Sequence, residues 1–308
     1  IVYPDKFDFL LAADVADDAV DILTRIEHHG VVGAQLDRVA QTIRDHHHVT
    51  DHALFLVPHF AHAQVTVDER LAPGQPLVVI AHRAVGGGAP ENSLAGIRYA
   101  IERGVDMVEI DVRVTRDGQY ILMHDSSLSR TTNVEDVFPD GAPWLDPDDP
   151  LAFEQLVSDY TLEEISRLRL RDPGGGDHPV ATLEAALDLA EGRLLMLLEL
   201  KNSEVESLVP LLNRYDTDNL LLWTQGDRRK LADIAAAVGV GVADYFPNVT
   251  NIEARLDKAI ELFGPLLKLA GVGSQAITPE LVSIADTRGL RVDVDTRFRI
   301  PLEPDGTV

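Results

Sequence analysis

The chain has 308 residues, of which 45% are hydrophobic and 25% charged, proportions typical of a globular protein with a sizeable core. It carries 27 Lys and Arg against 51 Asp and Glu, so its formal net charge is −24, and such a surface repels nucleic acid and anionic membranes. The absence of cysteine excludes disulfides and thiolate metal sites, and no run approaches the roughly 18 apolar residues of a membrane span.

Residues 1–75 differ in pattern from the rest of the chain. Amphipathic periodicity predicts two helices, near 13–29 and near 33–46. A histidine-rich stretch follows over 46–62, but its histidines share no metal-ligand spacing, so we interpret it as structural rather than as a zinc site. We therefore predict an N-terminal helical extension, for which the sequence indicates no role.

From residue 76 to residue 308, short apolar strands alternate with helices. The predicted strands are 77–82, 107–112, 120–125, 193–200, 219–224, 240–246, 274–278 and 291–296. The predicted helices are 92–104, 162–169, 183–191, 204–214, 228–237, 251–263 and 280–288. Continuous apolar strands alternating with helices predict an α/β fold with a parallel sheet covered by helices.

About eight strands favour a (β/α)8 TIM-type barrel, with an open doubly wound sheet as the alternative. A hairpin-type turn at Asp117-Gly118 makes the strand count ambiguous, so irregular or incomplete closure of the barrel is part of the prediction. Residues 131–160 are rich in Asp and Pro and predict a long acidic loop insertion within this 76–308 domain.

Two predicted strands carry charged residues near their carboxyl ends, where a parallel barrel has its binding site. Glu109 and Asp111 are two residues apart, as are Glu199 and Lys201, so each pair lies on one face of its strand. Buried carboxylates need a partner, and three that converge indicate a cation. All-oxygen ligands indicate Mg²⁺ or Ca²⁺; a set of structural ion pairs is the alternative.

Histidines end two of the predicted strands beside this acidic group. His82 is the last residue of the first strand, and His124 lies near the end of the strand at 120–125. Imidazole titrates near neutral pH, so two such residues can divide acid and base work. Arg83 adds a planar guanidinium suited to a phosphate oxygen.

Four motifs follow one another over residues 78–201: "AHR" followed six residues later by "PENS", then "EIDVRVTRDG", "HDSSLSRTTN" and "LELK". In this order and at this spacing they resemble the glycerophosphodiester phosphodiesterase family. The resemblance implies a barrel enzyme that uses one divalent cation, Ca²⁺ or Mg²⁺. It implies hydrolysis of small anionic glycerophosphodiesters to sn-glycerol 3-phosphate and an alcohol, through a cyclic phosphate.

The resemblance also implies roles for individual residues. His82 and His124 would be the acid/base pair, and Arg83 and Lys201 would contact the phosphate. The ligands of the metal would be Glu109, Asp111 and Glu199. Ala84 stands where the family pattern leads us to expect glycine.

Two further segments, "TNVEDVFPDGAPW" and "SDYTLEEI", are more similar to the secreted, glycerol-phosphate-releasing branch of the family. This similarity favours an extracytoplasmic location, periplasmic or secreted, over a cytoplasmic one. Two alternatives stay open: phospholipase-D-like action on lysolipids or sphingolipids by the same barrel, and a non-catalytic binding protein. The sequence indicates no oligomeric state.

Overall fold

The computed structural model describes residues 65–72, 75, 78–146, 153–172, 174–202, 205–246, 251–273 and 279–295. All of these belong to one compact unit, Ala63–Val308. Of the predicted N-terminal extension, only 65–72 and 75 are described, and they contain the short helix α3 (Val67–Arg70). The two helices predicted near 13–29 and 33–46, the histidine-rich stretch and the strand predicted at 274–278 lie outside the described residues.

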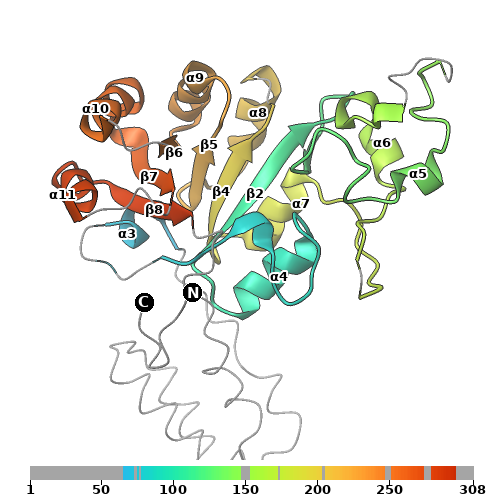
Figure 1. Ribbon diagram of the computed structural model, residues 1–308, viewed down its shortest axis with the longest axis horizontal. Coiled ribbons are helices and arrows are strands. Elements are labelled where there is room, and N and C mark those ends of the chain that lie inside the picture. Colours follow the sequence, from blue (N-terminus) through green and yellow to red (C-terminus); the bar gives the residue numbers. More distant parts are fainter. Residues whose placement is uncertain are drawn as a thin grey trace, which may run out of the picture. The chain divides into compact units, whose positions relative to one another are not determined.

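One curled sheet organises the described residues (Figure 1). Its strands are β1 (Ile80–Ala81), β2 (Met107–Val114), β3 (Tyr120–Leu122), β4 (Leu195–Leu200), β5 (Leu220–Trp223), β6 (Gly241–Phe246), β7 (Leu267–Gly273) and β8 (Arg291–Asp295). Seven strands are parallel, in the order β1-β2-β4-β5-β6-β7-β8, and β3 pairs antiparallel with β2 at Val112↔Leu122.

The predicted fold class is confirmed, including its incomplete closure. The strands follow the right order for a (β/α)8 barrel, but within the described residues β1 and β8 end the sheet and do not pair with each other. The predicted hairpin at Asp117-Gly118 supplies the eighth strand of the sheet, because it returns the chain as β3, antiparallel to β2.

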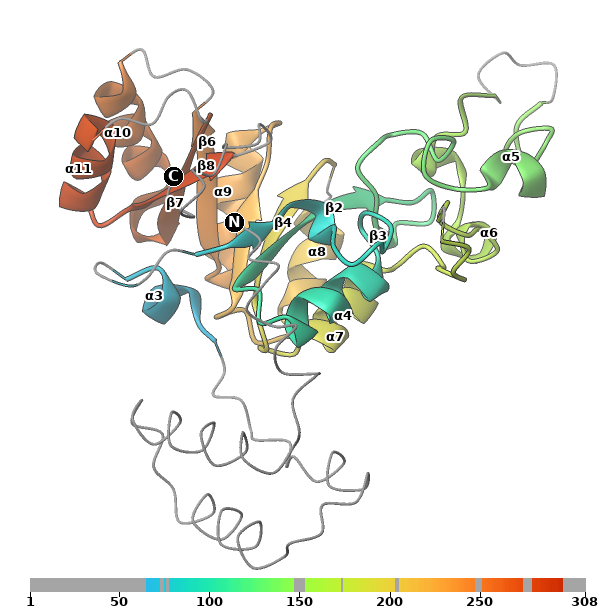
Figure 2. The same cartoon turned by 60° about the horizontal axis from the view of Figure 1, so that its bottom comes forward.

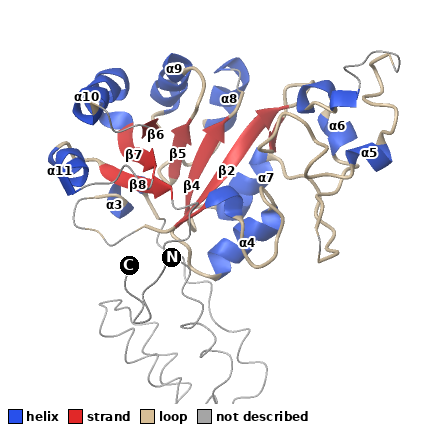
Figure 3. Ribbon diagram, in the orientation of Figure 1, coloured by secondary structure: helices blue, strands red, loops and turns tan. Residues whose placement is uncertain are grey.

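Helices cover the outer face of the sheet, as Figure 3 shows for those that follow β4 to β7. The helices of the sheet are α4 (Leu94–Glu102), α7 (Leu183–Ala190), α8 (Val205–Leu212), α9 (Arg228–Val238), α10 (Ile252–Phe263) and α11 (Pro279–Thr287). Their starts follow the predicted signals: the Ser93 side chain caps α4, and Pro279 begins α11. Among the described residues, no helix is both long enough and apolar enough to cross a bilayer.

The two faces of the sheet have different contents. On β2 the side chains of Val108, Ile110 and Val112 join the core beneath the helices. The alternate residue Met107 joins a smaller apolar cluster on the inner face, together with Leu195, Leu197, Leu221, Ala243 and Leu269. The inner face is therefore apolar at the amino end of the strands, and the charged residues of β2 and β4 lie above this layer.

The insertion after β3 has a core of its own. Twelve buried residues between Ile121 and Val180, among them Phe138 and Tyr160 with ring centroids 5.1 Å apart, pack together apart from the main core. This part contains α5 (Val134–Val137), α6 (Leu162–Ile165) and the 3-10 turns over Val157–Asp159, and it lies beyond the end of β2 (Figure 2). Thr161 and Glu164 form the predicted capping box of α6, although this helix is shorter than the predicted 162–169.

One strand was missed. β7 spans Leu267–Gly273 and pairs with both β6 and β8, whereas the sequence pattern placed no strand there. Lys268, Gly271 and Gly273 interrupt its apolar character. Gly271 is needed because a Cβ at this position would lie 2.9 Å from the ring of Tyr245 on β6.

Candidate active site

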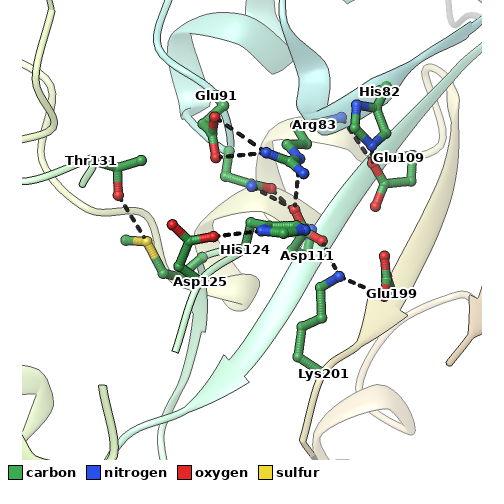
Figure 4. A network of polar contacts seen from close by, with 12 residues as sticks. His82, Arg83, Glu91, Glu109, Asp111, His124, Asp125, Thr131, Glu199 and Lys201 are labelled. Atoms are coloured by element: carbon green, nitrogen blue, oxygen red, sulfur yellow. Dashed lines mark hydrogen bonds and ion pairs between the residues drawn. The ribbon is translucent and has the colours of Figure 1, made fainter. Parts of the chain in front are cut away.

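Three buried carboxylates meet on the inner face of the sheet, at the carboxyl ends of β2 and β4. Asp111 and Glu199 are directly opposed in the parallel register of the two strands, and Glu109 lies one step below on the same face. Glu109, Asp111 and Glu199 each offer an oxygen, and these oxygens all lie within 4.8 Å of one another. The structure thus brings together the three acidic residues that the sequence selected (Figure 4).

Two neighbours hold Asp111 in place. The Lys201 ammonium lies 3.0 Å from Asp111 Oδ1 and 2.5 Å from Glu199 Oε1. Asn92 donates from Nδ2 to Asp111 Oδ2 at 2.8 Å and accepts from the Asp111 main-chain N–H at 2.9 Å. Asn92 has a left-handed φ of 54°, a conformation that Asn tolerates better than most residues. Its role is therefore to fix a carboxylate, while the next residue, Ser93, caps the helix.

The acidic group is short of positive charge. Burial, followed by the charges of Asp111 and Glu199, raises the pKa of Glu109 to about 8. Burial also raises the pKa of Glu199, against the opposing effect of Lys201. Within the described part of the chain, Glu109 Oε1 is buried and has no hydrogen-bond partner. The Lys201 ammonium, together with an Arg83 guanidinium that is shared with Glu91, thus leaves three neighbouring carboxylates incompletely neutralised.

The His82-Arg83 segment lies in a tight turn directly after β1. Residues His82–Ala84 form a 3-10 turn in which Arg83 and Ala84 have φ of 53° and 50°. The Arg83 main-chain N–H donates to Glu109 Oε2 at 2.9 Å. The turn sits directly on α4, because a Cβ on Gly96 would lie 2.1 Å from the Ala84 carbonyl oxygen. Ala84, found where glycine was expected, is buried in a conformation that glycine adopts more easily.

The Arg83 guanidinium is shared between two carboxylates. Its Nη1 donates to Glu91 at 3.2 Å, and its Nε lies 3.6 Å from Asp111 Oδ2. Figure 4 shows this planar group between Glu91 and Asp111, at the edge of the acidic group.

The two histidines reach the site from opposite directions. The His82 side chain is 51% exposed, and its Nε2 lies 3.8 Å from Glu109 Oε2. His124 follows β3, which runs antiparallel to β2 and so brings the chain back towards Asp111, whose carbonyl accepts from the Met123 N–H at 3.0 Å. The sequence placed both histidines at equivalent strand ends; this was wrong, because one of the two strands is inverted.

His124 is held at both its main chain and its ring. Arg113 on β2 donates from Nε and Nη2 to the His124 carbonyl oxygen at 2.9 and 2.6 Å. The ring Nδ1 lies 2.6 Å from Asp125 Oδ1, which leaves Nε2 as the nitrogen available for chemistry. Arg113 was not selected from the sequence, although its position two residues beyond Asp111 on the same face of β2 was readable.

A hollow of about 450 Å³ adjoins these groups. Its lining includes Arg113, His124, Glu199, Lys201 and Gln225. Two cationic side chains, one imidazole and one buried carboxylate thus border a space of the size that a small ligand needs.

Comparison with known proteins agrees with this geometry. A model of the Glycerophosphoryl diester phosphodiesterase family matches residues 82–231, the stretch that carries all the residues above. This part of the chain belongs to the glycerophosphoryl diester phosphodiesterase family. The family assignment made from the sequence motifs is therefore confirmed, while its secreted branch stays a prediction.

The matches to individual relatives cover only part of each relative's length. The chain is 32% identical over 136 residues to a glycerophosphodiester phosphodiesterase of Bacillus altitudinis, a match to 41% of this chain and 45% of the relative. It is 27% identical over 167 residues to a glycerophosphodiester phosphodiesterase of Caldanaerobacter subterraneus, covering 51% of this chain and 61% of the relative. In both matches the chain spans less than two thirds of the relative.

Among solved structures, a glycerophosphoryl diester phosphodiesterase from Parabacteroides distasonis superposes with a TM-score of 0.57 at 26% identity. The superposition covers 74% of this chain and 76% of that protein. The superposition therefore covers a larger share of the chain than the region matched by the family model, residues 82–231.

Proposed function

We propose that this chain hydrolyses glycerophosphodiesters to sn-glycerol 3-phosphate and an alcohol. The observation that carries the proposal is one juxtaposition: three buried carboxylates, a histidine 3.8 Å from one of them, and a second histidine on the adjoining hollow. Family membership of residues 82–231 supports the same reaction.

A divalent cation, Mg²⁺ or Ca²⁺, fits the acidic group. Its ligands would be Glu109, Asp111 and Glu199, an all-oxygen set of the kind these ions prefer. The buried Glu109 oxygen without a hydrogen-bond partner and the raised pKa of this residue both indicate a missing positive charge. When bound, such a cation would supply Lewis-acid stabilisation of the negative charge on the phosphoryl oxygens.

Arg83 and Lys201 would bind the non-bridging phosphate oxygens. Arg83 offers a permanently charged fork at the rim of the acidic group, and Lys201 lines the hollow. Both cations already lie against Asp111, so they are oriented before substrate arrives. Preorganised donors of this kind stabilise charge that develops on phosphorus during reaction.

His82 and His124 would move the protons. One imidazole takes the proton of the glycerol 2-hydroxyl, whose oxygen attacks phosphorus, and the other gives a proton to the departing alcohol oxygen. The product of this step is a cyclic phosphate and the free alcohol. Water then opens the ring with the two roles exchanged, which returns both imidazoles to their starting state and yields glycerol 3-phosphate.

The test is a product assay on the whole chain with glycerophosphocholine, before and after EDTA and after addition of Mg²⁺ or Ca²⁺. Detection by ³¹P NMR separates glycerol 3-phosphate from phosphocholine, the product of cleavage on the other side of phosphorus. We expect glycerol 3-phosphate, loss of activity with EDTA and recovery with one of the two cations. Turnover that persists unchanged in EDTA contradicts the metal assignment.

Lysophosphatidylcholine in the same assay distinguishes the alternative substrates. Preferential turnover of this acylated substrate would replace the proposal by phospholipase-D-like activity. Binding of glycerol 3-phosphate without turnover of any diester would indicate a non-catalytic protein.

A further inference from the structure

A chain of alternating charges connects the two histidine-bearing segments. His124 Nδ1 contacts Asp125 Oδ1 at 2.6 Å, and the other Asp125 oxygen accepts from Arg130 Nε. Arg130 Nη1 and Nη2 donate to the two oxygens of Glu91 at 2.9 and 2.7 Å. Glu91 in turn accepts from Arg83 Nη1 at 3.2 Å. Residues distant in sequence thus form one continuous network of ion pairs.

Arg130 is the member that joins the two halves of this network. Its Nε faces one carboxylate, and its two terminal nitrogens grip the other in a bidentate arrangement. Only a planar guanidinium has donors in this fork geometry; a lysine ammonium is a single point of charge. Arg130 does not line the hollow beside His124 in the described part of the chain, so it is not placed to touch substrate there.

Arg130 contributes more to the orientation of Glu91 and Asp125 than to the stability of the fold. Its side chain is 48% exposed, and ion pairs of exposed side chains contribute little to folding. Its partners Glu91 and Asp125 are better shielded, so their orientation depends on the fork that holds them. Arg130 thereby fixes the carboxylate that contacts the His124 ring.

The protonation of these partners supports this arrangement. The hydrogen bond from Arg130, followed by that with His124, lowers the pKa of Asp125 to about 2, against an opposing effect of burial. The pKa of Glu91 is also lowered, first by its hydrogen bond with Arg130. Asp125 is therefore an acceptor, and the contact requires the proton of the neutral His124 ring to sit on Nδ1.

We propose that Arg130 is a positioning residue that clamps Asp125 and Glu91, so that His124 presents Nε2 to the substrate while the Arg83 turn keeps its place. The proposal rests on the proposed diesterase function for its kinetic consequence only. Its structural consequence, the tautomer of His124, is independent of turnover.

The kinetic test compares Arg130→Met and Arg130→Lys with Arg171→Met in the full chain. Arg171 is a matched control: it lies in the same insertion, is 47% exposed and pairs with Glu135 at 3.1 Å. For Arg130→Met we expect kcat on glycerophosphocholine to fall about 10- to 100-fold, with little change in KM. Losses of this size are typical when a residue that orients a functional side chain by hydrogen bonding is removed. Arg130→Lys should recover little, and Arg171→Met should match the parent.

The second readout is the tautomer of His124, measured by ¹⁵N NMR of histidine-labelled protein and assigned by the signal lost in His124→Gln. The parent and Arg171→Met should show the proton on Nδ1, and Arg130→Met and Arg130→Lys a mixture. An unchanged tautomer in both Arg130 variants, full activity of Arg130→Lys, or a raised KM with normal kcat would each overturn the proposal. If the parent cleaves no diester, the proposed function fails while the tautomer still decides the role of Arg130.

Discussion

The part of the sheet formed by β1, β2 and β4 differs from the part formed by β5, β6 and β7, although both repeat the same strand and helix pattern. The first part places Glu109, Asp111 and Glu199 above the apolar layer of the inner face. At the corresponding level of the second part, Trp223 and Tyr245 meet edge to face with ring centroids 5.9 Å apart. The buried carboxylates of the acidic group are therefore concentrated in one part, and the other part carries an aromatic pair at that level.

Backbone conformation follows the same division. Of the six non-glycine residues with a left-handed φ in the described part of the chain, Arg83, Ala84 and Asn92 all belong to the loop after β1. Each such residue costs about 1 kcal/mol or more relative to an ordinary conformation. The loop is held in this conformation by its contacts with Glu109, Asp111 and α4. Strain that accumulates where buried charges also gather indicates a site shaped for chemistry rather than for stability.

The largest expected effect is that of His124→Gln. Loss of one proton-transferring group should lower kcat about 10²- to 10⁴-fold. His178→Gln is the matched control, because His178 also contacts an aspartate, Asp172, at 3.2 Å but lies outside the hollow. We expect both variants to unfold at the parent temperature by circular dichroism, and only the first to lose activity. Near-parent kcat in His124→Gln would remove this residue from the acid/base pair.

Removal of a proposed metal ligand should have the next largest effect. Glu199→Gln should raise the metal concentration for half-maximal activity at least ~10-fold, in a titration of EDTA-treated enzyme. Asp244→Asn provides the contrast, because Asp244 is a buried carboxylate on β6 that pairs with Arg228 instead of joining the acidic group. This variant should keep the metal titration of the parent. Identical titrations for all three proteins would contradict the assignment of Glu199.

These contrasts bear on how much the sequence could predict. The alternation of side chains along a strand has a period of two, so Glu109 with Asp111 and Glu199 with Lys201 were predicted to share a face, and they meet as expected. The strands other than β7 were also predicted within a few residues, because their apolar runs are continuous.

What the sequence could not predict depends on contacts between distant segments. The hydrogen bonds of Asn92 with Asp111 and of Arg130 with Glu91 join residues 19 and 39 positions apart, which no local period reveals. The hairpin-type turn at Asp117-Gly118 predicted the antiparallel direction of β3, but it did not predict the register of β3 on β2. The register of β3 on β2 determines from which side His124 reaches the acidic group.

Substitution of Gly96 or Gly241 by alanine tests how much space the backbone has in each of the two parts of the sheet, and we expect smaller effects on activity than for the variants above. In Gly96→Ala the new Cβ would meet the main-chain oxygen of Ala84 at 2.1 Å, so the turn carrying His82 and Arg83 must shift. In Gly241→Ala the nearest atom, 2.8 Å away, is the end of the Leu221 side chain, which can rotate. Gly96→Ala should lower the free energy of unfolding by about 1–3 kcal/mol, measured in urea, and should also lower kcat.

Gly241→Ala should destabilise less and should leave kcat unchanged. Equal kinetic effects of the two substitutions would show that the turn after β1 is no more sensitive than the second part of the sheet.

The smallest effect is a difference in the pH dependence of stability. The pKa of Asp125 is lowered to about 2 by Arg130 first and then by His124, compared with about 3.9 in an unfolded chain. Its folded state binds fewer protons than its unfolded state, so its stabilising contribution is complete above about pH 5 and is lost as the pH falls towards 2. The difference in unfolding free energy between the parent and Asp125→Asn should therefore shrink between pH 6 and pH 3.

Asp244 should show the opposite trend. Burial raises its pKa despite the charge and hydrogen bond of Arg228, so the folded state takes up a proton at a higher pH than the unfolded state does. Acidification towards pH 4 therefore favours the folded parent relative to Asp244→Asn. Urea unfolding of the parent and both variants at several pH values gives the two slopes. Opposite signs mean that Asp125, beside the first part of the sheet, is kept charged by its partners, whereas burial of Asp244 in the second part favours its protonated form. Slopes of the same sign would show that burial, rather than the arginine clamp, governs both residues.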